Sequence, residues 1–222
     1  GPFALVLAPS RELATQTFGV LDSLSSALAS EDRNVRLSGV HLVGGGVGVR
    51  EQLSELGSHG AHFCVGTPGR ILDALRRRLM SLRGCRLLVL DEADRLMDSR
   101  FEPELRGILD SFESQRQTLM FSATMAPRLA SFARSALVAP VVMHADRAGV
   151  GAARIAQRVR VVSADADVLP ALLNALARTC PPTLVFAESP RAVDELHEEL
   201  LRRGVRATAL HGGRDQTERD AA

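Results

Sequence analysis

Apolar residues in this chain fall into two patterns that alternate along it. Short apolar runs are typical of buried parallel strands, whereas longer stretches with apolar positions every three to four residues are typical of amphipathic helices. Together these patterns predict a parallel sheet with helices on both faces. In the first part of the chain, strands are predicted at 3–7, 39–43, 63–66, 87–90, 118–121 and 141–143, and helices at 11–29, 49–56, 69–77, 104–112 and 127–136.

The alternation lapses once, in a segment of small residues and glycines, and then resumes. We expect this segment, 146–155, to be a linker between two α/β domains at 1–145 and 156–222. Because the second domain has only three predicted strands, we expect it to be incomplete and the sequence to be a fragment of a longer protein. Its predicted strands lie at 157–162, 183–186 and 205–210, and its helices at 168–177, 192–203 and from 215 onward.

The composition narrows the class of protein. The 222 residues are 45% hydrophobic, enough for a buried core, and hold no apolar stretch of the roughly 18 residues that a membrane span needs. No membrane partner is therefore expected. Three cysteines without C-x-x-C spacing favour reduced thiols in an intracellular protein over a zinc site. The net charge is only +1, so contacts with nucleic acid would have to be local.

Three residue types, Lys, Trp and Tyr, are informative by their absence from the sequence. All 27 basic residues are arginines, so a phosphate-binding loop of the form G-x-x-x-x-G-K-[ST] does not occur within these 222 residues. There is also no Trp and no Tyr, which argues against aromatic platforms for stacking nucleic-acid bases.

Three carboxylates follow the apolar run at 87–90 directly, in the sequence Asp91-Glu92-Ala93-Asp94. Open α/β sheets bind their ligands at the carboxyl ends of the strands. A carboxylate there can hold a hydrated Mg²⁺ that bridges nucleotide phosphates, and its neighbour can orient a water for attack on the γ-phosphoryl group. The alternative is a solvated acidic turn, because such turns often follow strands.

Hydroxyl groups follow the next predicted strand, in Ser122-Ala123-Thr124. If the two strands are neighbours, these hydroxyls can bond to the carboxylates. A capping turn before Pro127 is the alternative.

Other short blocks have residue types suited to phosphate. Ser10 and Arg11 open the first predicted helix, and Thr67-Pro68-Gly69-Arg70 opens another; helix N-termini attract phosphate, although ordinary capping explains each block equally well. Glycines at 44–46 allow a ligand to approach the backbone closely. Near the end, Gln216 and Arg219 have a Q-x-x-R spacing that places both on one helical face.

Taken in order, these blocks resemble the DEAD-box family of ATP-dependent RNA helicases over essentially the whole chain. Within that family, the stretches 81–97, 115–125, 132–140 and 186–219 resemble the Abstrakt group, which is linked to pre-mRNA splicing. The blocks that carry the resemblance are P-S-R-E-L-A at 9–14, the glycine doublet, T-P-G-R at 67–70, D-E-A-D at 91–94, S-A-T at 122–124 and Q-x-x-R at 216–219.

The resemblance implies a RecA-like sheet followed by an incomplete second RecA-like domain, with ATP and Mg²⁺ as cofactors. It implies that Asp91 coordinates Mg²⁺ through water, that Glu92 orients the attacking water, and that Asp94 bonds to Ser122 and Thr124 and so couples the nucleotide to domain closure. The residues that it implies for contact with the RNA sugar-phosphate backbone are Ser10, Arg11, Gly45, Thr67, Gly69, Arg70 and Arg219.

The implied function is that of an ATP-dependent RNA helicase that opens short duplexes or remodels RNA-protein complexes without reading base sequence. The resemblance suggests spliceosomal proteins as partners and the nucleus as the location. Because the phosphate loop would precede residue 1 and the arginine finger would follow residue 222, we expect the 222 residues alone to be inactive. The alternatives are an ATP-independent RNA-binding or scaffolding module with this fold, and a DNA helicase or other RecA-like motor.

Three positions depart from the family pattern. Ser10 stands where Thr is more usual, and it keeps the hydroxyl. Arg100 stands where Gly is usual, which puts the local turn after the acidic block in question. Arg214 stands where Lys is more usual, and it keeps the charge but changes the geometry of any contact.

Overall fold

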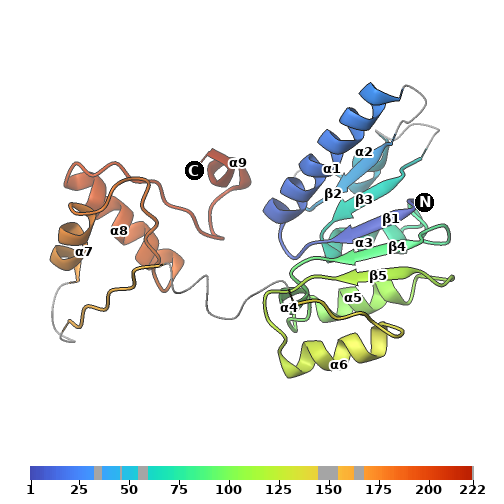
Figure 1. The fold of residues 1–222 in the computed structure, drawn as a ribbon. Helices are drawn as coiled ribbons and strands as arrows, with labels where there is room; N and C mark the ends of the chain where they lie inside the picture. Colours follow the sequence, from blue (N-terminus) through green and yellow to red (C-terminus); the bar gives the residue numbers. More distant parts are fainter. Residues whose placement is uncertain (33–36, 46, 55–59, 145–154, 163–167, 222) are drawn as a thin grey trace. The chain divides into compact units, whose positions relative to one another are not determined.

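A parallel sheet of five short strands forms the centre of the first of two units, Gly1–Val142 (Figure 1). The computed structural model describes residues 1–32, 37–45, 47–54, 60–144, 155–162 and 168–221. The strand order is β2-β3-β1-β4-β5, and every neighbouring pair is parallel. The predicted parallel α/β sheet is therefore confirmed. The strands are β1 (Ala4–Leu7), β2 (Gly39–Leu42), β3 (Phe63–Gly66), β4 (Leu87–Leu90) and β5 (Gln117–Met120).

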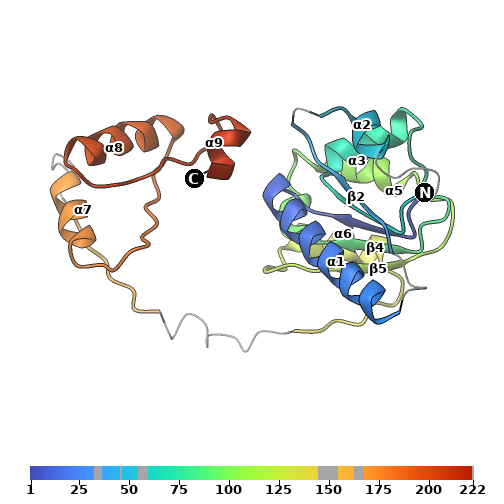
Figure 2. The same cartoon turned by 90° about the horizontal axis from the view of Figure 1, so that it is seen from above.

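Helices cover both faces of this sheet (Figure 2). α1 packs on β2 and β3 from one face, whereas α2, α3 and α5 lie together on the other. The two faces follow from right-handed crossovers, because the chain moves one way along the sheet from β1 to β2 and the opposite way afterwards. The helices of this unit are α1 (Arg11–Glu31), α2 (Val49–Ser54), α3 (Pro68–Arg76), α4 (Ala93–Leu96), α5 (Glu102–Leu109) and α6 (Pro127–Ala136).

The side chains of β1 alternate between two hydrophobic clusters. Leu5 and Leu7 belong to the larger one, with Ile71 of α3 and Leu129 of α6, and Val6 belongs to the smaller one beneath α1. Because successive side chains of a strand point to opposite faces, one apolar strand supplies both layers. This explains why the strands read as continuous apolar runs rather than as alternating ones.

The predicted strand at 141–143 is not formed, and this prediction is wrong. Val141 and Met143 are 87% and 88% exposed, and no strand is assigned there. The apolar run resembles a strand, but a strand is held by a hydrogen-bonded neighbour, and the described residues provide none beside this segment.

The second unit, Met143–Ala222, contains helices close to the predicted positions. Its predicted strands at 157–162, 183–186 and 205–210 are not assigned among the described residues, so these predictions are wrong for the same reason. Side chains such as Val159 and Phe186 are more than 90% exposed. The predicted linker lies outside the described residues apart from Ile155. The helices are α7 (Leu169–Leu176), α8 (Pro190–Arg202) and α9 (Gln216–Ala221).

No described helix combines the length and the apolar character that crossing a membrane requires.

Candidate functional site

The acidic block begins where β4 ends, and hydrogen bonds to both neighbouring strands hold it. The N–H of Asp91 donates to the carbonyl of Leu7 at 3.0 Å, and the N–H of Ala93 donates to the carbonyl of Phe121 at 2.9 Å. Glu92 between them has a left-handed backbone, with φ 45° and ψ 53°, and its N–H donates to Asp91 Oδ1 at 3.0 Å. A non-glycine residue in this conformation costs about 1 to 3 kcal/mol, and such strain is concentrated at functional sites.

Asp94 lies beside the hydroxyl block that follows β5. Thr124 Oγ1 donates to Asp94 Oδ2 at 2.7 Å, and Ser122 Oγ donates to the carbonyl of Thr124 at 2.8 Å. The hydroxyl of Thr124 chiefly, and that of Ser122 to a lesser extent, lower the pKa of Asp94, while partial burial opposes them. Two blocks 30 residues apart are therefore joined through an ionised carboxylate.

Glu92 has one close cationic neighbour. Arg95 Nη1 lies 3.2 Å from Glu92 Oε2, and the two side chains are 68% and 42% exposed. An ion pair this exposed contributes little to stability and is readily exchanged for another partner of the carboxylate. Glu92 is therefore available to a ligand at this end of the strand.

The donor chemistry of Asp91 and Glu92 suits Mg²⁺. No group of three or more metal-binding side chains occurs in the part of the chain that the structure describes. Mg²⁺ does not require one, because it keeps several waters and is typically held by one or two carboxylates together with substrate phosphates. Both side chains are only half-buried, so they can accept a hydrated ion.

The loop between β2 and α2, here called the glycine loop, lies close to arginines from two other elements. Gly45 has a φ of +112°, and a Cβ there would lie only 2.7 Å from Arg11 Nη1. Arg70 donates from Nε to the carbonyl of Val43 at 3.0 Å and from Nη2 to that of Val47 at 3.1 Å. Arg70 therefore ties the loop to the start of α3, and the Arg11 side chain at the start of α1 lies close to Gly45.

Two hydroxyls at helix starts behave differently. Ser10 caps α1, since its Oγ accepts the N–H of Leu13 at 3.2 Å, which is the ordinary capping role. Thr67 precedes α3 but makes no side-chain cap bond. Its hydroxyl is therefore not used to stabilise the helix end.

The strand order sorts the candidate residues into two neighbouring sets. All strands are parallel, so their carboxyl ends share one edge of the sheet. Residues after β2, β3 and β1 supply the set predicted to bind RNA, and residues after β4 and β5 supply the carboxylates and hydroxyls. The first set consists of Ser10, Arg11, Gly45, Thr67, Gly69 and Arg70, and the second of Asp91, Glu92, Asp94, Ser122 and Thr124.

Arg219 belongs to the second unit, on α9, where its Nη1 donates to Gln216 Oε1 at 3.3 Å. The same unit holds a polar cluster that sequence reasoning missed, formed by Asp194, His211 and Arg214. No motif spacing indicates it, because Asp194 lies 17 residues before His211.

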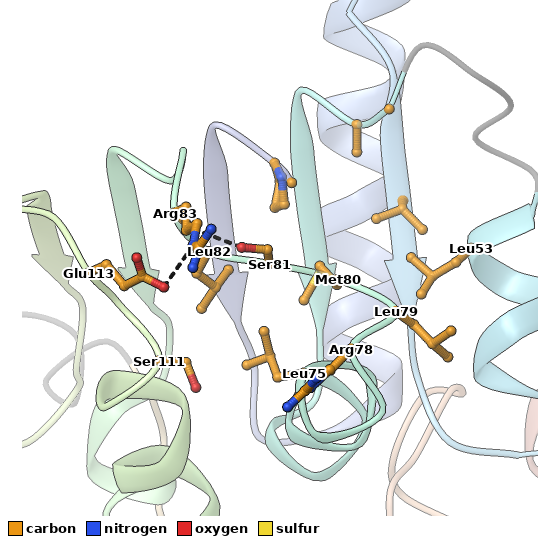
Figure 3. Close-up of a pocket in the computed structure, with 15 residues that line it drawn as sticks. Leu53, Leu75, Arg78, Leu79, Met80, Ser81, Leu82, Arg83, Ser111 and Glu113 are labelled. Atoms are coloured by element: carbon orange, nitrogen blue, oxygen red, sulfur yellow. Dashed lines mark hydrogen bonds and ion pairs between the residues drawn. The ribbon is translucent and has the colours of Figure 1, made fainter.

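A cavity in the described residues lies away from this edge (Figure 3). Its volume is about 920 Å³, and Pro2 before β1 and Leu82 before β4 place it at the amino ends of the strands. Arg83 and Glu113 form an ion pair of 2.8 Å at its wall. It contains none of the candidate residues.

Comparison with known proteins identifies relatives over the whole chain. The family model described as DEAD/DEAH box helicase matches residues 1–132. A putative DEAD-box ATP-dependent RNA helicase 43 of Arabidopsis thaliana is 48% identical over 222 residues, which are 100% of this chain and 40% of the relative. The ATP-dependent RNA helicase abstrakt of Drosophila melanogaster is 45% identical over 223 residues, which cover 100% of this chain and 35% of the relative. The chain thus spans well under half of these relatives.

Solved structures also align with the whole of this chain and show which fold it has. A DEAD box protein from the hyperthermophile Methanococcus jannaschii aligns over 100% of this chain and 57% of its own, with 29% identity and a TM-score of 0.58. S. cerevisiae Dbp5 bound to RNA and ADP BeF3 aligns over 100% of this chain and 54% of its own, with 24% identity and a TM-score of 0.74. The predicted RecA-like fold is confirmed by these neighbours.

Proposed function

The chain belongs to the DEAD/DEAH box helicase family, and on that premise we propose that the complete protein is an ATP-dependent RNA helicase. It couples ATP hydrolysis to the opening of short RNA duplexes or to the remodelling of RNA-protein complexes. The observation that carries the proposal is the bond from Thr124 to Asp94, which joins the D-E-A-D and S-A-T blocks beside Glu92.

The carboxylates after β4 have separate roles in this proposal. Asp91 would hold a hydrated Mg²⁺, and Glu92 would orient the attacking water and accept its proton. When bound, Mg²⁺ supplies positive charge that offsets the charge of the phosphates. The tight turn at Glu92 supports this assignment, because the left-handed backbone is held by bonds on both sides and so fixes where the carboxylate begins.

Asp94 has a different role from Asp91 and Glu92. Its carboxylate is already engaged by Thr124, a residue of the segment that follows β5. A shift of the acidic turn when nucleotide binds would therefore be passed to that segment. We assign Asp94, Ser122 and Thr124 to coupling rather than to the hydrolytic step.

The RNA-binding set reads the sugar-phosphate backbone. Arg11 supplies charge, Thr67 a hydroxyl, and Gly45 and Gly69 allow close approach of the chain. Arg70 donates hydrogen bonds to two backbone carbonyls of the glycine loop, so it acts partly by holding that loop in place. Contacts of this kind position a nucleic acid without reading its sequence, and contacts to the 2′-hydroxyl select RNA over DNA.

We further propose a role in pre-mRNA splicing, with spliceosomal proteins as partners and the nucleus as location. Two relationships support it: the 45% identity to abstrakt, and the alignment with the yeast DEAD-box splicing factor Prp28 at 28% identity and a TM-score of 0.57. Affinity purification of the tagged complete protein from nuclear extract tests this role. Recovery of spliceosomal proteins is expected, and a purely cytoplasmic protein with no such partners would contradict it.

Strand displacement tests the helicase proposal itself. A short RNA duplex is mixed with the complete protein, with ATP or without nucleotide, and release of the labelled strand is followed. We expect release that requires ATP. Equal release in both arms would instead favour an ATP-independent RNA-binding module.

A further inference from the structure

A polar cluster in the second unit ties α8 to the loop before α9. Asp194 of α8 accepts two bonds on the same oxygen, Oδ1: one from Arg214 Nη2 at 2.7 Å and one from His211 Nε2 at 3.0 Å. The His211 side chain is only 11% exposed, whereas that of Asp194 is 44% exposed. The bond from Arg214 first, and that from His211 second, keep the pKa of Asp194 below its ordinary value, so the carboxylate stays charged at neutral pH.

The backbone determines which nitrogen of His211 carries the proton. The N–H of Gly213 donates to Nδ1 at 3.2 Å, so Nδ1 is the acceptor and Nε2 carries the hydrogen that points to Asp194. Arg214 Nε also lies 3.4 Å from Nε2. Since both nitrogens then carry a hydrogen, this approach is packing and not a hydrogen bond. His211 therefore joins α8 to the loop through its two ring nitrogens.

Arg214 reaches two helices at once. Its Nη2 donates to Asp194 on α8, and its Nη1 lies 3.5 Å from Glu218 Oε1 on α9. Glu218 Oε2 in turn accepts the N–H of Asp215, the residue before α9, as in the second half of a capping box. The guanidinium is a rigid fork, so it can hold two carboxylates in fixed directions, which the single ammonium of a lysine cannot.

The position of α9 decides where Arg219 lies, because Arg219 directly follows Glu218 on this short helix. We propose that Asp194, His211 and Arg214 are positioning residues that hold α9 so that Arg219 contacts the RNA backbone. This inference rests on the proposed function, in which Arg219 is the RNA contact of the second unit. It also gives a physical reason for arginine, rather than the more usual lysine, at position 214.

The test is the affinity of the complete protein for single-stranded RNA, measured by fluorescence anisotropy. Asp194→Ala should weaken binding about tenfold, as expected for the loss of a charge-assisted contact. Asp194→Asn keeps an oxygen that can accept from both His211 and Arg214, so it should recover most of the affinity. Glu195→Ala is the matched control, because the ion pair of Glu195 with Arg191 on α8 is exposed, and it should bind like the wild type.

A double-mutant cycle separates this inference from the function on which it rests. In an Arg219→Ala background, Asp194→Ala should add less than about twofold, because it acts through Arg219. Additive effects of the two substitutions would overturn the inference. It would also be overturned if Arg219→Ala weakened binding while Asp194→Ala bound RNA like the wild type. Wild-type affinity of Arg219→Ala itself would instead overturn the proposed RNA contact, and the inference with it.

Nitrogen NMR of His211 provides a second readout that does not depend on RNA. The wild type should show the tautomer with hydrogen on Nε2, and Asp194→Ala should speed hydrogen exchange at the Gly213 amide. A wild-type ring with hydrogen on Nδ1 would contradict the cluster.

Discussion

One hydroxyl, that of Thr124, is the main cause of the lowered pKa of Asp94. Thr124 donates to it at 2.7 Å, whereas Ser122 donates mainly to the carbonyl of Thr124. The two hydroxyls are therefore not equivalent, although both lie in the same three-residue block. Removing one or the other should have different consequences.

We predict that Thr124→Val raises the pKa of Asp94 toward its ordinary value of about 3.9. The folded-state pKa of Asp94 is lowered, so this carboxylate stabilises the fold above its unfolded-state pKa, and the effect is lost as pH falls through its folded-state pKa. The variant should therefore lose no more than about 1 kcal/mol of unfolding free energy at pH 7, because the group is largely exposed.

Carboxyl NMR titration and denaturant unfolding at several pH values measure these effects. The two stability curves should converge once the pH falls below the lowered folded-state pKa of Asp94, where this carboxyl is protonated in both proteins. Ser122→Ala, the matched comparison, should raise the pKa of Asp94 by a smaller amount. A stability difference that persists unchanged at low pH would show that the hydrogen bond is not its source.

Of the two glycines proposed to contact RNA, Gly45 and Gly69, only Gly45 has a steric reason in the structure. We predict that Gly45→Ala destabilises the protein by about 1 to 2 kcal/mol, because φ is +112° and an alanine Cβ would also displace Arg11. RNA affinity should fall with it. Gly69→Ala is the control for stability, since a Cβ there meets nothing within 4 Å and alanine favours the helix.

Some residue-level features could be predicted from sequence and others could not. The carboxylates of 91–94 were predicted at a strand end because apolar runs mark buried strands. The left-handed backbone of Glu92 was not predicted, since non-glycine residues rarely adopt it. The cluster at Asp194 was missed because contacts between a helix and a later loop leave no periodic pattern.

The order of elements along the sheet brings the separate blocks together. β5 lies beside β4, which brings Thr124 to Asp94, and β1 lies between β3 and β4, which places the residues proposed to bind RNA next to the carboxylates. Apolar periodicity predicts strands but not their order, so this arrangement could be expected only from the resemblance. α4 was also not predicted, because a single turn leaves no helical pattern.

The unformed strands at 141–143 and in the second unit have a common cause. Their apolar residues have the composition of strands, but sheet formation requires a partner that local sequence does not identify. Helices such as α8 form regardless, because their hydrogen bonds are internal and Ser189 caps the start.

Arg70 links α3 to the glycine loop through two hydrogen bonds. We predict that Arg70→Lys weakens RNA binding about fivefold to tenfold, because one ammonium cannot reproduce the two bonds to Val43 and Val47. Anisotropy titration measures the affinity. Arg86→Lys is a control, since Arg86 lies at the start of β4, away from the site. Unchanged affinity of Arg70→Lys would show that the loop does not need this brace.

At the scale of all 222 residues, net charge gives little attraction for RNA. Because these residues have a net charge of only +1, their affinity for RNA has to come from local contacts with phosphates. We predict that log affinity falls linearly with log salt, with a slope of about −0.7 per phosphate contact, or roughly −3.5 for about five contacts. Binding measured across a salt series gives the slope. A flat response would indicate a binding mode other than backbone contact.

We propose above all that the carboxylates after β4 serve ATP hydrolysis that drives work on RNA. It is tested most directly by RNA-stimulated ATP hydrolysis of the complete protein and its Glu92→Gln variant, with ATP binding measured in parallel. We predict at least a hundredfold loss of turnover with ATP binding retained, because glutamine cannot accept the proton of the attacking water. Undiminished turnover in Glu92→Gln would contradict the account.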